Sequence, residues 1–231
     1  IPVEVSDDDL ARDDVEVQLA IDTKGNAKGS MTIVLRGREA QILADAFEEK
    51  VGADRLDLLR AVVLAWLPWA DVEKVELTSR EGAWEVALRA EIGVTGFAQP
   101  EGALRVLPGI ATLHRTQPQS STSTLGATFA AQGGRENALA IESAFHYRVK
   151  RRIQLPEGWS LAVAPSQVDV TTSHLRAQRQ SRIEGSVIEE TFTLSVPTGT
   201  VSTSEFDEFA SKARSVDDSF LSSIRVRSSG K

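Results

Sequence analysis

IESAFHYRVKRRIQLPEGW, residues 141–159, is a long stretch in which apolar and polar side chains alternate. Its apolar positions are Ile141, Phe145, Tyr147, Val149, Ile153 and Leu155. A period of two is typical of a β-strand with one buried face. Arg151 falls on the otherwise apolar face, so we expect a bend or bulge at Arg151 and Arg152 that lets the strand serve two sheets. A straight strand with Arg151 buried and unpaired would contradict this prediction.

The composition is that of a folded protein, because 41% of the 231 residues are apolar and 26% are charged. Residues 1–100 carry 11 basic and 20 acidic side chains, a balance of −9, and residues 101–231 carry 15 and 13, a balance of +2. This asymmetry indicates two parts. Since no strongly basic region emerges, the sequence argues against a nucleic-acid partner. No run approaches the roughly 18 apolar residues of a membrane span.

The first half predicts an acidic linker followed by a sheet with two helices. Residues 1–14 form the linker, because five aspartates fall within residues 6–14 without the spacing of a calcium loop. In residues 15–115, alternating runs at 15–21, 31–35, 75–77 and 84–92 predict two β-hairpins in one antiparallel sheet. Between them, residues 38–51 and a second segment capped by Asp54 predict a helical hairpin on the apolar face. The two helical stripes are Ala40, Leu43, Phe47 and Val51, and Leu56, Leu59, Val63 and Trp66.

The second half predicts a connector and an antiparallel β part. Residues 116–134 are rich in Ser, Thr, Gln and Gly, which is typical of an exposed, mobile connector. In residues 135–231, further alternating runs lie between turn signals, and Ser204 is expected to cap one short helix. The predicted fold is therefore α+β and mainly β: an antiparallel sheet with a helical hairpin, followed by an antiparallel β-sandwich or barrel with one short helix.

Basic side chains on two strands of the second half form a candidate binding patch. They are Arg148, Lys150, Arg152, Arg176, Arg179 and Arg182. Such a patch attracts carboxylates or phosphates. The alternative is a solvated strand face on which these residues pair with nearby acids such as Glu184, Glu189 and Glu190, and we favour this alternative.

The sequence shows no catalytic motif, metal-ligand motif or cofactor motif. His114, His146 and His174 are far apart and lack the spacing of a metal site on one element. The chain contains no cysteine, so it has no thiolate nucleophile, and its serines lie in no Gly-x-Ser-x-Gly or Ser-x-x-Lys motif. We therefore assign no catalytic residue, no metal and no cofactor.

Several short pieces of the chain resemble one family. These pieces are residues 15–36 with the two helices that follow, residues 153–159 with their Leu-Pro-Glu-Gly-Trp turn, the strand at 188–196 and the Phe-Asp-Glu-Phe helix that starts at Phe206. They are similar to the β-rich region that follows the catalytic core in bacterial exported, multi-domain, transglutaminase-like proteins. The resemblance spans roughly residues 15–227. It implies that the Cys-His-Asp core of such a protein lies upstream and that this chain is its non-catalytic C-terminal portion.

The expected function is that of a structural or binding module rather than an enzyme. The resemblance implies a protein partner, either the upstream domain or a cell-envelope component, and a periplasmic or cell-surface location. Two rivals remain open. One is a stand-alone enzyme with a site between the two parts, built on His114, His146 or the strip from Arg148 to Arg152. The other is a subunit of an envelope complex that pairs through an exposed sheet edge.

Overall fold

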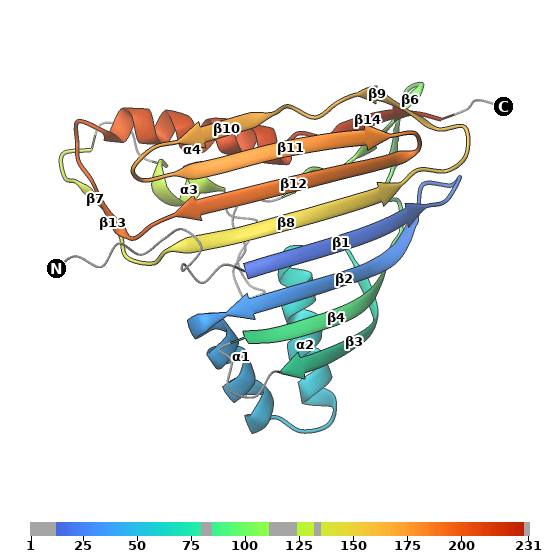
Figure 1. Cartoon of the computed structure of the whole chain (residues 1–231), viewed down its shortest axis with the longest axis horizontal. Coiled ribbons are helices and arrows are strands. Elements are labelled where there is room, and N and C mark those ends of the chain that lie inside the picture. Colours follow the sequence, from blue (N-terminus) through green and yellow to red (C-terminus); the bar gives the residue numbers. More distant parts are fainter. Residues whose placement is uncertain (1–12, 80–84, 111–123, 132–134, 229–231) are drawn as a thin grey trace.

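The computed structural model describes residues 13–79, 85–110, 124–131 and 135–228. The prediction of an α+β, mainly β chain is confirmed (Figure 1). The acidic residues before Asp13, together with Trp84 and His114, lie outside the described residues.

The largest element is an eight-stranded mixed sheet in the order β10-β11-β12-β8-β1-β2-β4-β3. Its strands are β1 (Asp13–Ile21), β2 (Ala27–Arg36), β3 (Asp71–Ser79), β4 (Glu85–Val94), β8 (Phe145–Gln154), β10 (Val168–Thr171), β11 (Arg176–Glu184) and β12 (Val187–Val196). The two hairpins predicted in the first half are confirmed, and β2 and β4 pair antiparallel as expected. All other pairings in this sheet are also antiparallel except the one between β1 and β8.

The parallel pairing of β1 with β8 joins strands from the two halves of the chain. Its register runs from Asp13 opposite Tyr147 to Ala20 opposite Gln154. Strands that precede the connector predicted at residues 116–134 and strands that follow it therefore belong to one sheet (Figure 1).

The opening stretch forms three strands rather than one bent strand. It divides into β7 (Leu139–Ile141), β8 and, after the Pro-Glu-Gly-Trp turn, β9 (Ser160–Val163). β8 keeps an uninterrupted register with both neighbours, so the predicted bend or bulge at Arg151 and Arg152 is wrong, and β8 serves one sheet. Arg151 is buried, but it is paired with Glu190, which removes the steric and electrostatic reason for a bulge.

Two helices cover the inner face of the sheet beneath the first half, as predicted. They are α1 (Gly37–Glu49) and α2 (Ala53–Trp66), which contact β2, β4 and β3. Asp54 does not cap α2: the N-cap is Gly52, whose φ of 56° favours glycine, and Asp54 lies in the first helical turn. Val51 lies beyond the end of α1, and both Val51 and Leu56 are exposed, so these two members of the predicted stripes are wrong.

The third covering helix, α4 (Phe206–Leu221), is 16 residues long and contacts β10 and β11. Its N-cap is Glu205 rather than Ser204, and the helix extends through Phe220, so the predicted short helix is too short. Beyond it lies a second sheet, in the order β5-β6-β14-β9. Its further strands are β5 (Gln99–Glu101), β6 (Leu104–Leu107) and β14 (Ile224–Arg227), and a two-stranded sheet pairs β7 with β13 (Gly199–Val201).

Part of the predicted connector is structured. Residues 125–129 form the short helix α3 (Leu125–Phe129), which packs on α4 and buries Leu125 and Phe129. Asp217 of α4 accepts hydrogen bonds from the backbone N–H groups of Leu125 (2.8 Å) and Gly126 (2.7 Å). The expectation of an exposed connector is therefore wrong for these residues, because their apolar side chains and two backbone donors have partners on α4.

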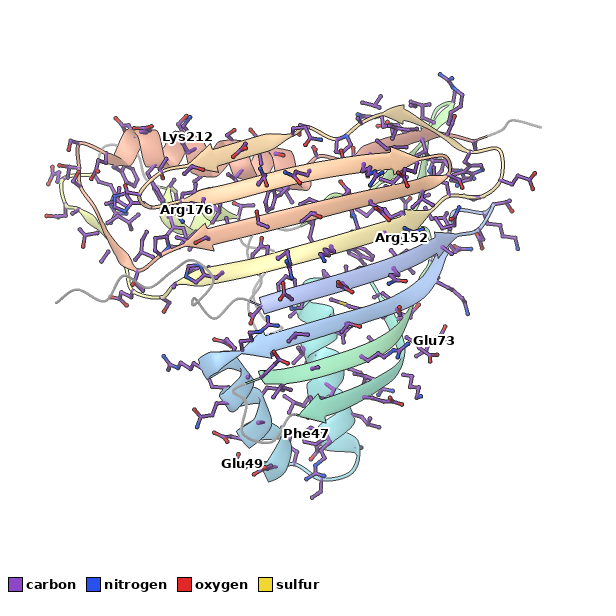
Figure 2. The ribbon with its side chains drawn as sticks, in the orientation of Figure 1. Phe47, Glu49, Glu73, Arg152, Arg176 and Lys212 are labelled. Atoms are coloured by element: carbon purple, nitrogen blue, oxygen red, sulfur yellow. The ribbon has the colours of Figure 1, made fainter. Side chains whose placement is uncertain are left out.

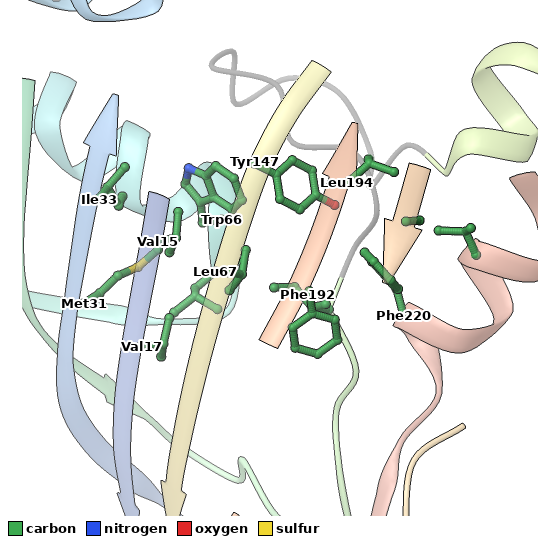
Figure 3. Packing of buried hydrophobic residues seen from close by; sticks show 14 of the residues in the cluster. Val15, Val17, Met31, Ile33, Trp66, Leu67, Tyr147, Phe192, Leu194 and Phe220 are labelled. Carbon is green, nitrogen blue, oxygen red and sulfur yellow. The ribbon is translucent and has the colours of Figure 1, made fainter. Parts of the chain in front are cut away.

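The inner face of the sheet forms one continuous hydrophobic core (Figure 3). The Trp66 and Tyr147 rings meet edge-to-face with centroids 5.4 Å apart, which attaches α2 to β8. On the other side, the Phe192 and Phe220 centroids are 5.2 Å apart, which attaches α4 to β12. The opposite, outer face of the sheet is left for polar side chains.

Candidate binding face

The outer face of the eight-stranded sheet is lined mainly by polar side chains. Along most of the strands the side chains alternate between the buried core and this face, and the described helices lie behind the sheet (Figure 1). Figure 2 looks onto this face, with Arg152 and Arg176 on it. The strand registers align its side chains in rows across the sheet.

A ridge of ion pairs runs along β1 and β8 in the middle of the face. Asp14 accepts from Arg148 (2.8 Å) and from Arg36 (2.7 Å), and the ammonium of Lys150 lies 3.7 Å from Glu16. These side chains are partly exposed, so each pair contributes only about 0–1 kcal/mol. The ridge therefore defines the charge pattern of the outer face but contributes little to the free energy of unfolding.

The predicted basic patch is only partly assembled. Arg148 and Lys150 belong to the ridge, Arg152 pairs with Glu189, and Arg182 pairs with Glu184. These four residues agree with the alternative of a solvated face whose bases pair with nearby acids. Arg176, also on this face, lies at the start of β11.

Arg179 does not belong to the patch, and its assignment there is wrong. It is 1% exposed and lies on the inner face, because strand alternation places it opposite to Arg176 and Arg182. Its guanidinium donates to Glu190 Oε1 at 2.7 Å, and the Arg151 guanidinium donates to the other carboxylate oxygen of Glu190. Arg151, Glu190 and Arg179 thus form a buried ionic triad, the name used for these three residues below.

Backbone carbonyls complete the buried ionic triad. Arg151 also donates to Pro108 O at 2.7 Å, and Arg179 donates to the carbonyl of Ser219 and to Ser222 Oγ at 2.7 Å. The carbonyls at the end of α4 carry the negative end of the helix dipole, which favours a cation there. The guanidinium N–H groups that Glu190 does not bind therefore have acceptors, and the helix dipole offsets part of the second positive charge.

The triad also sets the charge state of its carboxylate. Burial alone raises the pKa of Glu190, but the charges and hydrogen bonds of Arg151 and Arg179 outweigh burial and hold that pKa below its ordinary value. Burial lowers the pKa of the Arg179 guanidinium, and Glu190 opposes this effect. The group is ionic and structural, and it connects the sheet to α4 and to the segment at Pro108 and Gly109.

A hollow of about 260 Å³ opens on the outer face over β8, β12, β11 and β10. The outer-face side chains that line it are His146, Asp169, Thr171, Arg176, Gln178, Thr193 and Ser195. Two contacts order them: His146 Nδ1 lies 2.8 Å from Ser195 Oγ, and Gln178 Nε2 donates to Asp169 Oδ2 at 3.1 Å. Below we call this hollow the β12 hollow.

A second hollow of about 500 Å³ lies on the same face over β1, β2 and β4. Ser30 and Thr32 of β2 form its floor, and Gln18, Glu85 and Arg89 stand beside them. Both hollows therefore have hydroxyl side chains on the middle strand and longer polar side chains on the flanking strands.

The His146 and Ser195 contact is the arrangement nearest to a catalytic pair. Its distance suits a base and a hydroxyl nucleophile. However, β12 lies between β8 and β11, so its backbone N–H groups are donated to the flanking strands and do not form an oxyanion hole beside Ser195. The geometry therefore suits binding better than acyl transfer.

The other histidines add no site. His174 Nε2 lies 3.7 Å from Glu205, apart from the β12 hollow, and His114 is outside the described residues. Within the described ranges, no group of three or more His, Cys, Asp or Glu side chains is placed to hold a metal ion. The basic residues of the patch and the three histidines were visible in the sequence. The β12 hollow was not, because its walls come from four strands.

Comparisons with known proteins leave the family open. The chain matches no protein-family model and no curated protein. Among solved structures it is similar to yeast LTA4 hydrolase in complex with bestatin, with a TM-score of 0.31 and 9% sequence identity. The match covers 81% of this chain and 28% of that chain, and at this TM-score it does not define a shared fold. In the described part of the chain, no helix has the length and apolar character needed to cross a membrane.

Proposed function

We propose that this chain is a non-catalytic binding module, the C-terminal portion of an exported transglutaminase-like protein, and that its outer sheet face contacts the upstream domain of the same polypeptide. The observation that carries the proposal is the outer face itself: eight strands wide, polar, and lying on the side of the sheet away from α1, α2 and α4. The resemblance of the sequence to the region after a catalytic core supplies the identity of the partner.

The charge pattern of the face favours a protein partner. Along the ridge, acidic side chains of β1 lie opposite basic side chains of β8, and basic residues such as Arg148 and Arg152 are matched by acids. A mosaic of both signs complements another protein surface with the inverse mosaic, whereas a nucleic acid requires an excess of basic groups. The formal net charge of −7 agrees with this preference.

Lysine footprinting tests the contact directly. Lys150 is exposed on the outer face of β8, and Lys212 is exposed on α4, so the two report on different parts of the surface. Acetylation rates would be compared between this chain alone and the polypeptide expressed from the full reading frame. We expect Lys150 to react at least several-fold more slowly in the longer polypeptide, with Lys212 unchanged.

Two outcomes would contradict the proposal. Equal acetylation rates of Lys150 in the two proteins would show that the upstream domain does not cover the outer face. A full reading frame without an upstream Cys-His-Asp domain would remove the transglutaminase-like assignment. The periplasmic or surface location belongs to the same proposal and is tested by cell fractionation with an antibody against this chain.

One observation favours a second candidate function, that of a hydrolase. The His146 and Ser195 contact of 2.8 Å would activate the Ser195 hydroxyl. A fluorophosphonate probe would then label the protein, and the Ser195→Ala variant would lose the label. We expect no labelling above that of the variant, because the backbone donors around Ser195 are used in the sheet.

A further inference from the structure

The β12 hollow exists because short side chains on one strand lie between long side chains on its neighbours. In one row across the sheet, Ser195 of β12 faces His146 of β8 on one side and Arg176 of β11 on the other. The flanking strands are about 9.5 Å apart across β12, since neighbouring strands are separated by about 4.8 Å. The hydroxyl is thus the floor, and the imidazole and guanidinium are the walls.

The next row extends this arrangement. Thr193 of β12 forms the floor between Arg148 of β8 and Gln178 of β11, and Gln178 pairs onward with Asp169 of β10. Arg148 is held by Asp14, belongs to the ridge and does not line the hollow. The hollow therefore has a hydroxyl floor two residues long, with His146 on one side and Arg176 and Gln178 on the other.

The lining is balanced in charge and mixed in hydrogen-bonding character. Among the described residues that line the hollow, Arg176 is the one guanidinium and Asp169 the one carboxylate. They stand diagonally on neighbouring strands, because Arg176 is opposite Thr171 and Asp169 is opposite Gln178. Such diagonal positions are about 7–8 Å apart. A ligand that satisfies both groups carries an anion and a hydrogen-bond donor at a similar separation.

We propose that the β12 hollow binds an acidic residue of an extended peptide, with the carboxylate on Arg176 and a backbone N–H on Asp169. A guanidinium binds a carboxylate through two parallel hydrogen bonds, and the Thr193 hydroxyl supplies a further donor beneath it. The hollow lies on the outer face that the proposed function assigns to the upstream domain, but this proposal does not rest on that function, because peptide binding is measured on this chain without that domain.

The size and charge of the hollow select this ligand class. A volume of about 260 Å³ is below the roughly 300–1,000 Å³ of pockets that enclose whole small molecules, so it suits one residue of a longer chain. Asp169 repels a dianionic phosphate more than it repels a singly charged carboxylate. Along the four strands that form the hollow, the described outer-face side chains include no Phe, Tyr or Trp ring for stacking against a sugar or a base.

Nuclear magnetic resonance titration of the full chain tests the proposal with three capped tripeptides. The acidic probe is acetyl-Ala-Glu-Ala-amide, its neutral match is acetyl-Ala-Gln-Ala-amide, and acetyl-Ala-Ala-Ala with a free terminal carboxylate tests the other source of a peptide carboxylate. We expect saturable shifts with the glutamate peptide at a Kd of about 1 mM, a value typical of one small recognised group. The shifts should be confined to β8, β10, β11 and β12.

Two variants separate the hollow from general attraction to a charged face. Arg176→Gln should weaken binding of the glutamate peptide about ten-fold or more, since a charge-assisted pair is lost. Arg182→Gln is the matched control, because Arg182 lies on the same face of β11 and does not line the hollow. It should leave the Kd unchanged. Preserved spectral dispersion would show that both variants remain folded.

The protein carries its own carboxylates before β1, at Asp7, Asp8 and Asp9, and they are a competing source of the same group. A triple Asp→Asn variant at these positions distinguishes the sources: tighter peptide binding in that variant identifies an internal competitor for a carboxylate site. The proposal is overturned if the glutamate and glutamine peptides give equal shifts, or if neither the wild type nor the triple variant gives saturable shifts. The lysine footprint at Lys150 is measured without peptide, so failure here leaves the proposed function untouched.

Discussion

Replacement of Glu190 by Gln should destabilise the protein far more than the same change at its neighbour Glu189. Glu190 is 2% exposed and holds the guanidiniums of Arg151 and Arg179 on its two oxygens. The amide that replaces this carboxylate would keep one acceptor oxygen but lose the charge, leaving two buried cations close together. Removing one partner from a buried ion pair costs about 3–5 kcal/mol.

Urea unfolding followed by circular dichroism measures the effect. With a denaturant slope of about 2–3 kcal/mol per molar urea for a protein of this size, the unfolding midpoint of Glu190→Gln should fall by roughly 1–2 M. Glu189→Gln is the matched control: Glu189 is adjacent, points to the outer face and pairs with a half-exposed Arg152. Its expected cost is about 0–1 kcal/mol.

The pH dependence of this difference follows from the pKa of Glu190. That pKa is lower in the folded protein than its ordinary value of 4.5, so the folded state binds this proton less tightly than the unfolded state. The stabilisation is fully present above about pH 4.5 and is lost as the pH falls through the folded-state value. The gap between wild type and Glu190→Gln should narrow in acid. A midpoint shift equal to that of Glu189→Gln at pH 7 would refute the account of the buried ionic triad.

Three further perturbations test other contacts. Asp13→Asn should stabilise the protein increasingly between pH 4 and pH 7. Burial raises the pKa of Asp13 from 3.8 to about 7 in the folded state, so ionisation of this carboxyl opposes folding across that range. Thermal melts at several pH values measure the difference in stability between the variant and the wild type. Gly29→Ala should lower the free energy of unfolding in urea by about 1–3 kcal/mol, because a Cβ there would lie 1.7 Å from the Gln18 carbonyl oxygen. Gly93→Ala is the control. Its Cβ would meet one side-chain atom at 3.4 Å, so its cost should be less than about 1 kcal/mol. Asp217→Asn should cost about 1–2 kcal/mol and speed amide exchange at the start of α3, because two backbone N–H groups would lose a charged acceptor.

The alternation of side chains along single strands contains information that the predicted basic patch did not take into account. Arg179 differs in parity from Arg176 and Arg182, so the sequence already placed it on the opposite face of β11. Glu190 and Arg151 likewise fall among the apolar positions of their strands. Two bases and one acid on buried faces are the sequence signal of an ionic group in the core. Taken together, Arg151, Arg179 and Glu190 predict a buried ionic group and a regular strand at Arg151, without a bulge.

Long-range pairing could not be read in the same way. The hairpins follow from local turns and alternation, and they were predicted. The pairing of β1 with β8 joins residues more than a hundred positions apart, without a turn or a single crossover helix to indicate it. The β12 hollow depends on strands brought together by that order of the sheet, so the candidate site was also beyond the sequence. α3 was missed because the polar composition around residues 125–129 hid two apolar side chains.

The charge asymmetry between the two halves has an explanation at the seam between β1 and β8. The hydrophobic pattern excludes a shift of the register by one residue, because such a shift would turn every buried side chain toward solvent. A shift by two residues keeps the buried face intact, so apolar packing alone excludes it only weakly. In the observed register Asp14 is opposite Arg148 and Glu16 is opposite Lys150. A shift by two in one direction places Asp14 opposite His146 and loses one match, whereas a shift in the other direction places Asp14 opposite Lys150 and Glu16 opposite Arg152. The acidic strand of the first half and the basic strand of the second half thus disfavour one of the two shifts, and each pair contributes little to stability.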